Sequence, residues 1–264
     1  MGDISHVVRS SLESHGLSVV SAEFPQNTFR DEFGYGRGLL KAVDAYRPSV
    51  IFPIGDPLAL SRLRKKLPDG VTAATESEEK LKILGYKIPF SCLMSEMDIR
   101  QPFLYSSAEE ASGKDVIFKR DVSFGGHGVH RPRNTAALLN LIDHQPPGEP
   151  YLIEDYVEGE DWSVDAVRFG GSFRASSYKA LSSKGNGPSI QREVANFPAL
   201  EEIARAIMDR LGYNGVCGFD FKVDSAGIPY ILECNPRFTG GIGSQIEAGF
   251  DIPYYLWEGF SNLK

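Results

Sequence analysis

The segment Phe219–Arg237 places two acids and an amide where they could bind a divalent cation. Its middle, Asp-Ser-Ala-Gly at 224–227, has turn chemistry, and strand-like runs flank it, which predicts a β-hairpin. On a strand, side chains alternate between faces, so Glu233 and Asn235 share one face. If Asp220 joins them from the other strand, the hairpin gathers oxygen ligands of the kind that Mg²⁺ prefers.

The register of this hairpin decides whether the acids meet. If Asp224 faces Gly227, then Asp220 lies opposite Ile231 and on the same face as Glu233. The two acids are then diagonal neighbours, roughly 7 to 8 Å apart at the backbone, and both carboxylates can reach an ion that needs oxygens at about 2.0 to 2.1 Å. A shift of one residue would put them on opposite faces and leave ordinary surface acids.

A second candidate is the glycine-rich segment that follows the apolar run Val116–Phe118. A lysine ends this run, and glycines after it let backbone N–H groups approach a phosphate. The segment lacks the spacing of a P-loop, and a plain hairpin turn is the alternative. The candidate phosphate-binding residues here are Lys119, Ser123, Gly125, Gly126 and Gly128.

A third candidate is the acidic segment Tyr151–Asp165, an alternating strand, a glycine turn and a second strand. A solvated acidic hairpin is the simpler interpretation for Glu158 and Glu160, which we leave out of the site.

Taken together, these three motifs resemble the ATP-grasp superfamily over roughly Lys87 to Gly249, and they occur in the order expected for it. The resemblance implies that Asp220, Glu233 and Asn235 bind two Mg²⁺ ions on the phosphates of ATP, with Mn²⁺ as a substitute. It also implies that Arg237 contacts phosphate or an acyl phosphate.

The same resemblance assigns the nucleotide contacts. Lys119 corresponds to the lysine on the α-phosphate, although Arg120 stands where proline is common in the family. Lys87 is the second phosphate lysine, chosen over its neighbours by its spacing to Pro102; a solvated helix lysine is the alternative. Lys179 takes the place of an arginine that neutralises the transferred phosphate. The adenine-contacting segment is Glu154, Asp155, Tyr156 and Val157, and Asp161 takes the ribose role.

The implied reaction is activation of a carboxylate by ATP, followed by attack of an amine or similar nucleophile. The expected partners are therefore a small-molecule carboxylate and an amine, and the sequence leaves homodimerisation open. Two alternatives remain: a phosphotransferase subunit like that of carbamoyl-phosphate synthase, and a nucleotide-binding module that acts with another protein.

Composition is that of a soluble globular protein of 264 residues, with 42% hydrophobic and 24% charged residues. There is no long apolar stretch or signal-peptide pattern, which predicts a cytoplasmic protein without a membrane partner. The net charge of −7 argues against nucleic-acid binding. Three cysteines without Cys-x-x-Cys spacing indicate neither a disulfide framework nor a zinc site.

The chain is expected to be α/β, with α+β character in its ATP-grasp part and ATP between two lobes. We expect an N-terminal α/β lobe at 1–86, which lacks the family's first strand, and an ATP-grasp domain at 87–264. Its small lobe should span about 103–157 and its metal-binding lobe about 158–264. The pattern predicts helices at Val7–Leu12, Leu39–Tyr46 and Leu200–Leu211, strands at Leu17–Ala22 and Ser49–Ile54, and a loop at Gly34–Gly38.

Overall fold

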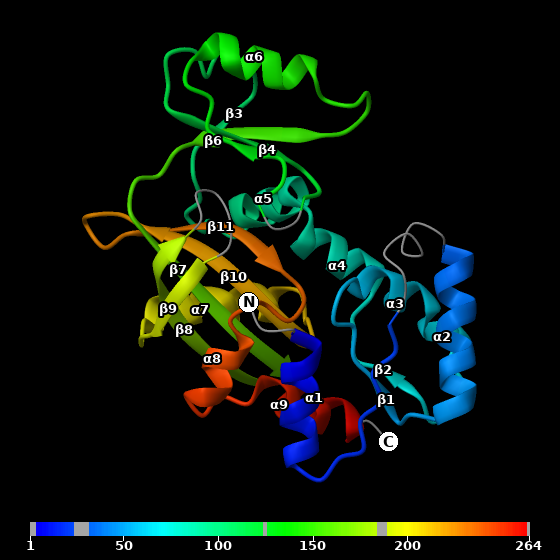
Figure 1. Cartoon of the computed structure of the whole chain (residues 1–264). Coiled ribbons are helices and arrows are strands. Elements are labelled where there is room, and N and C mark those ends of the chain that lie inside the picture. Colours follow the sequence, from blue (N-terminus) through cyan, green and yellow to red (C-terminus); the bar gives the residue numbers. More distant parts are fainter. Residues whose placement is uncertain (1–3, 24–31, 124–125, 184–188, 263–264) are drawn as a thin grey trace.

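The computed structural model describes residues 4–23, 32–123, 126–183 and 189–262 (Figure 1). It contains an N-terminal layer, a small sheet and a larger sheet, with helices packed against each. The mixture of helices and sheets confirms the expected fold class. None of the helices in the described ranges is long and apolar enough to cross a membrane.

The N-terminal layer is mostly helical around a short parallel pair of strands. Its elements are α1 (Ile4–Ser14), α2 (Glu32–Tyr46), β1 (Val50–Ile51), α3 (Pro57–Leu63), η2 (Arg64–Lys66), β2 (Thr72–Ala73) and α4 (Glu78–Gly85). Strand β1 pairs with β2 only through two residues, so the expected strand Ser49–Ile54 is shorter than its apolar run.

Two expectations for this layer are wrong. The segment Leu17–Ala22 forms no strand: Leu17 and Val19 pack against the core, but no strand in the described part of the chain pairs with them. The glycine cluster Gly34–Gly38 is helical and lies inside α2. Gly36 fits there because α3 packs closely: a Cβ at this position would lie 3.3 Å from the Leu63 Cδ2 atom.

The small sheet has strand order β3-β6-β4-β5, with all neighbours antiparallel. Its elements, after helix α5 (Lys87–Glu96), are β3 (Leu104–Tyr105), β4 (Val116–Arg120), β5 (Val129–His130), α6 (Thr135–Asp143) and β6 (Tyr151–Asp155). Helix α6 covers one face of this sheet, where Phe118, Leu138 and Ile153 form the centre of its core.

The larger sheet has order β11-β10-β7-β8-β9, again antiparallel. Its strands and helices are β7 (Glu160–Phe169), β8 (Ser172–Ser183), β9 (Ser189–Val194), α7 (Pro198–Arg210), β10 (Gly215–Val223), β11 (Pro229–Asn235), α8 (Ile242–Glu247) and α9 (Ile252–Ser261). Helices α4, α5 and α7 bury their apolar faces on β7, β10 and β11. Helix α5 thus lies between the two sheets in Figure 1 and contacts both.

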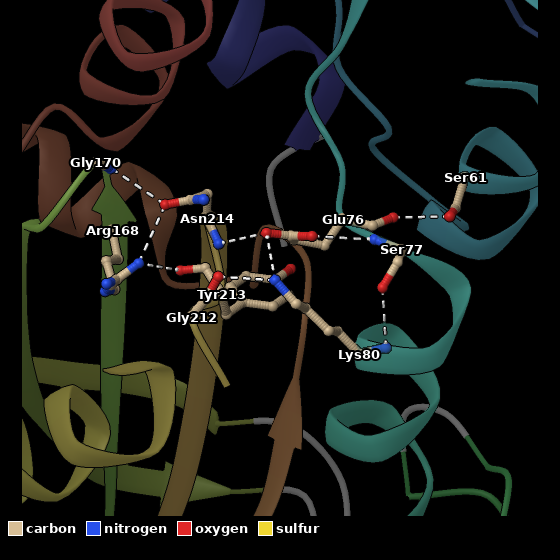
Figure 2. A network of polar contacts seen from close by, with 9 residues as sticks. All are labelled: Ser61, Glu76, Ser77, Lys80, Arg168, Gly170, Gly212, Tyr213 and Asn214. Carbon is tan, nitrogen blue, oxygen red and sulfur yellow. Dashed lines mark hydrogen bonds and ion pairs between the residues drawn. The ribbon is translucent and has the colours of Figure 1, made fainter. Parts of the chain in front are cut away.

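A polar network joins the N-terminal layer to the larger sheet (Figure 2). The Lys80 Nζ atom donates to the Gly212 carbonyl at 2.8 Å and pairs with Glu76 at 3.2 Å. Glu76 also accepts from the Asn214 backbone N–H at 2.8 Å, and Arg168 donates to the Asn214 side chain at 3.1 Å. Because Glu76 is mostly buried, this network fixes the N-terminal layer against the loop between α7 and β10.

Candidate active site

The β10–β11 hairpin brings the two candidate acids together through a β-bulge. Asp220 pairs directly with Glu233, whereas the next pair is Phe221 with Ile231, so Leu232 is the extra residue. The expected register, with Asp220 opposite Ile231, is therefore wrong. Ile231 is buried in the core, on the face opposite the acids. Without the bulge, Glu233 would point to the core face as well.

The candidate metal ligands and Ser163 form one hydrogen-bonded group. The Asn235 Nδ2 atom lies 3.4 Å from Asp220 Oδ2 and 3.3 Å from Glu233 Oε1. The Ser163 hydroxyl on β7 donates to Asp220 Oδ1 at 2.6 Å. Arg237 donates to the Asn235 side-chain oxygen at 3.3 Å, which places its guanidinium beside the acids.

The pKa values of the two acids are shifted in opposite directions. Burial and the charge of Glu233 raise the pKa of Asp220 to about 7. Burial also works to raise the pKa of Glu233, but the positive charges of Lys87 and Lys119 outweigh it and lower that pKa. A proton taken up by the pair therefore resides on Asp220, and a cation at this position would relieve the repulsion between the two carboxylates.

Lys87 reaches the hairpin from the start of α5. Its Nζ atom lies 3.5 Å from Glu233 Oε2 and donates to the Ser123 hydroxyl at 3.0 Å, and its side chain is only 6% exposed. Asp121 fixes the start of this helix, since its carboxylate accepts from the Ile88 backbone N–H at 2.7 Å. The structure thus joins Lys87, Ser123 and Glu233, which lie far apart in the sequence.

Lys119 at the end of β4 forms a buried ion pair with Glu154 on β6. The Nζ and Oε1 atoms are 2.5 Å apart, and each side chain is 7% exposed. Burial raises the pKa of Glu154 even though Lys119 acts to lower it. The side chain of Glu154 is therefore engaged by Lys119 rather than free to meet another group.

The end of β6 and the segment after it show how the adenine candidates are oriented. The Asp155 carboxylate accepts a hydrogen bond from the Tyr105 hydroxyl, and the Tyr156 ring lies under the Arg131 guanidinium, 3.4 Å from its centroid. Val157 is only partly buried, and in the described residues its backbone N–H and C=O make no hydrogen bond. Its backbone is the part of this segment that is left to meet a ligand.

Asp161 lies on the same face of the larger sheet as Asp220, and it forms an ion pair with Lys222 at 2.8 Å. Lys222 also donates to the Gly159 carbonyl. This lysine was not among the candidate residues from the sequence.

The glycine-rich segment lies between β4 and β5 in the sequence, and the structure describes its residues 121–123 and 126–128. Gly126 and Gly128 have φ values of 78° and 79°, which favour glycine, and the Gly128 carbonyl accepts from Arg120 N–H at 3.0 Å. Ser123 ties the start of the segment to Lys87. Gly125 lies outside the described residues.

Lys179 does not lie with the residues around Asp220, Glu233 and Asn235. It pairs across the sheet with Trp162, and its ammonium binds the exposed Glu160 at 2.6 Å. Its neighbour Tyr178 pairs with Ser163 and so shares the face of Asp220. Lys179 therefore points to the opposite face, and this orientation depends on the register of β7 and β8, which no sequence motif reveals.

Arg192 on β9 approaches the face that carries Asp220 and Tyr178, with its guanidinium 5.0 Å from the Tyr178 ring. Its positive charge works to lower the pKa of Asp165, which burial raises. Asp165 is fully buried and accepts a hydrogen bond from the Thr239 hydroxyl at 2.8 Å. Besides Lys222, sequence reasoning missed Asp121, Ser163, Tyr178 and Asp165, which are ordinary strand or loop residues without a motif.

A cavity of about 420 Å³ opens beside this group. Lys87, Glu233, Asn235 and Arg237 line one part of it. Ser123, Cys234 and Pro236 also line it, and the remaining wall comes from the N-terminal layer, including α4, and from α5.

Comparison with known proteins agrees with this geometry. Residues 148–263 match the family model described as ATP-grasp in the biosynthetic pathway with Ter operon. The carbamoyl phosphate synthase large chain of Thermoanaerobacter sp. (strain X514) is 25% identical over 211 residues, which is 71% of this chain. The corresponding protein of Caldanaerobacter subterraneus subsp. tengcongensis is 23% identical over 214 residues, also 71% of the chain. The chain spans only 19% of the length of these relatives.

Solved structures show the same fold over nearly the whole chain. Biotin carboxylase from Campylobacter jejuni, in a β,γ-ATP complex, matches with a TM-score of 0.78 at 16% identity and covers 99% of this chain and 69% of its own. An L-amino acid ligase from Bacillus licheniformis matches with a TM-score of 0.73 at 14% identity, over 96% of this chain and 70% of its own.

The family model covers the part of the chain that carries the larger sheet and the acidic hairpin. In this part the sequence is similar to ATP-grasp proteins, and the fold of nearly the whole chain is shared with the solved structures.

Proposed function

We propose that the protein is an ATP- and Mg²⁺-dependent ligase. It would activate a carboxylate as an acyl phosphate for attack by an amine or similar nucleophile, releasing ADP and phosphate. The observation that carries the proposal is the group formed by Asp220, Glu233 and Asn235, with Lys87 bound to Glu233 and Arg237 to Asn235. Cationic and anionic side chains converge there as phosphoryl transfer requires.

The donor set fits Mg²⁺. No three His, Cys, Asp or Glu side chains gather as a metal site anywhere in the described ranges. The hairpin instead offers two carboxylates and an amide, and Mg²⁺ is commonly bound through one or two carboxylates together with substrate phosphates. When bound, Mg²⁺ would neutralise phosphate charge and relieve the repulsion between Asp220 and Glu233; we propose two ions, with Mn²⁺ as a substitute.

The nucleotide would lie between the two sheets. Lys119 and Lys87 would hold its phosphates, with Ser123 and the glycines Gly125, Gly126 and Gly128 covering them. We propose that the segment Glu154–Val157 meets adenine, largely through the backbone of Val157, since the side chains of Glu154, Asp155 and Tyr156 are engaged elsewhere. Asp161 would bind the ribose in exchange for its contact with Lys222.

In the first step, a carboxylate oxygen of the substrate attacks the γ-phosphorus, and the bond from that phosphorus to the bridging oxygen of ADP breaks. In the second step, the nucleophile attacks the acyl carbon, phosphate leaves with the former carboxylate oxygen, and the amine loses a proton. Arg237 would stabilise the negative charge of the transferred phosphoryl group. The protein otherwise supplies position and charge neutralisation. We place this enzyme in the cytoplasm and allow for a homodimer.

A second candidate is a phosphotransferase subunit of the kind found in carbamoyl phosphate synthase, favoured by the identity of the curated relatives. Such a subunit would phosphorylate a small acceptor without needing an amine acceptor of its own. A nucleotide-binding module that acts with a partner is a third possibility, but it would not need the full set of acidic ligands.

The test is ADP release by the purified protein with Mg²⁺, ATP and a panel of carboxylates, each with and without amines. A ligase needs both a carboxylate and an amine for sustained turnover, and it forms a C–N product that mass spectrometry detects. Release that depends on bicarbonate alone supports the phosphotransferase. Nucleotide binding with no turnover on any acceptor contradicts both enzymes.

A further inference from the structure

The lining of the cavity beside the hairpin is of two chemical kinds. Lys87, Glu233, Asn235 and Arg237 form its polar part, where the candidate phosphate and metal contacts lie. Ile54, Leu58, Leu81, Leu84 and Phe90 form its apolar part, called the apolar end below, and the last four of these residues pack in one core cluster. These residues come from the N-terminal layer and from α4 and α5.

This cavity is separate from the proposed adenine site. None of the residues Glu154–Val157 lines it. Lys87 and Glu233 line the cavity and also belong to the residues proposed to hold the phosphates and the metal. A nucleotide base at Glu154–Val157 would therefore leave the cavity free for a second molecule. A molecule in the cavity would meet the terminal phosphate with its polar end, as an acceptor must.

We propose that the cavity binds the acceptor as a monocarboxylate with an apolar body, its carboxylate beside Arg237 and its body against Ile54 and Leu58. This inference rests on the proposed ligase function and specifies its substrate class. A volume of about 420 Å³ suits a small molecule.

The apolar end also selects against charged substrates. Burying a second carboxylate there would remove it from water without a cationic partner, which is costly. Asp56 lines the same end, and its carboxylate would repel a second acid. One oxygen of Asp56 already accepts from the Leu58 backbone N–H at 2.9 Å.

The test measures binding of 4-methylpentanoate and glutarate by calorimetry, with Mg²⁺ and a non-hydrolysable ATP analogue bound. A hydrophobic pocket distinguishes a single methylene by about 10 to 200-fold, so we expect 4-methylpentanoate to bind at least about tenfold more tightly than glutarate. Equal affinities, tighter binding of glutarate, or binding of neither acid would overturn the inference.

A variant locates the binding. Ile54→Trp fills the apolar end and should weaken 4-methylpentanoate binding at least about tenfold while leaving the affinity for the ATP analogue unchanged. If the Ile54→Trp protein does not fold, the Leu58→Phe variant is measured instead. The matched control is Leu139→Trp on α6, which is 42% exposed and far from the cavity. Unchanged 4-methylpentanoate binding in the folded cavity variant also overturns the inference.

The two proposals fail differently. If the wild-type protein binds no nucleotide in the presence of Mg²⁺, the proposed function fails and the acceptor assignment fails with it. If nucleotide binds and polar carboxylates are turned over, the ligase proposal stands and only the apolar substrate class is wrong.

Discussion

Asp220 and Glu233 face each other directly across β10 and β11, because the bulge at Leu232 shifts the register by one residue. The pair is held by the Asn235 amide on one side, and Lys87 lies against Glu233. Burial raises the pKa of Asp220, and the repulsion between the two neighbouring carboxylates raises it further. The bulge thus creates a site that favours a cation.

We expect Glu233→Gln to lose ATP turnover while the fold is kept. The substitution preserves volume but removes the charge that pairs with Lys87 and that the proposed metal would require. Loss of an outer partner of a metal ligand typically costs about 10 to 100-fold, so loss of a proposed ligand should cost at least about 100-fold in turnover. Steady-state ADP release and circular dichroism measure the two effects. Wild-type turnover in this variant would remove Glu233 from the metal site.

The hairpin could be predicted from the sequence because its ligands and its turn lie within twenty residues and follow local rules. Its register could not, since the bulge depends on how β11 pairs with β10 and on which residues the core needs. Ile231 is buried against the core, and the chain inserts Leu232 to return Glu233 to the polar face. The shared face was therefore predicted correctly, but from a wrong pairing.

Other parts of the site depend on contacts that no local pattern reveals. Asp121 fixes the helix of Lys87 from 33 positions away. Lys179 was placed by analogy with an arginine, whereas the β7–β8 register turns it toward Glu160. The N-terminal layer was the least predictable part, because Leu17–Ala22 alternates without a partner strand and Gly36 serves helix packing rather than a loop.

We expect Lys119→Met to weaken ATP binding more than Lys87→Met, because Lys119 is held rigidly in a buried ion pair. The variant also leaves Glu154 buried without its partner, and breaking such a pair costs about 3 to 5 kcal/mol. The double variant Lys119→Met/Glu154→Gln should recover much of this stability but not the binding. Nucleotide titration and chemical unfolding separate the two effects.

The control for both lysines is Lys82→Met, since Lys82 is exposed and forms an ion pair with Glu78 on its own helix. Undiminished ATP affinity in Lys119→Met would discredit the phosphate role of this lysine. Equal losses for Lys87 and Lys119 would contradict only their ranking.

We expect Arg237→Gln to reduce turnover far more than Lys179→Met. Arg237 lies beside Asn235 and the acids, whereas Lys179 points to the opposite face and binds an exposed glutamate. A stabilising donor at a reacting centre is worth about 100 to 1,000-fold in kcat, and this is the loss expected for Arg237→Gln. Parallel measurement of kcat in the two variants is decisive, and a larger loss for Lys179→Met would restore its proposed catalytic role.

The buried acid Asp165 should make stability depend on pH. Burial raises its pKa to about 6, against the opposing effects of the Thr239 hydrogen bond and the Arg192 charge. The unfolded chain should release this proton near pH 3.9, so between about pH 4 and 6 the folded state holds a proton that the unfolded state has lost. The contribution of Asp165 to the free energy of unfolding is therefore fully present below about pH 4 and is lost as pH rises through about 6.

Comparison with Asp165→Asn isolates this contribution, because asparagine keeps the shape and can still accept from Thr239. Relative to the variant, the wild-type protein should lose stability as pH rises from about 4 to 6, and the difference should be constant above about pH 7. Urea unfolding of both proteins at several pH values gives the difference directly. Other acids titrate in both proteins and cancel in the comparison. A difference that grows in favour of the wild-type protein as pH rises would mean that Arg192 and Thr239 outweigh burial, and that Asp165 is ionised in the folded state.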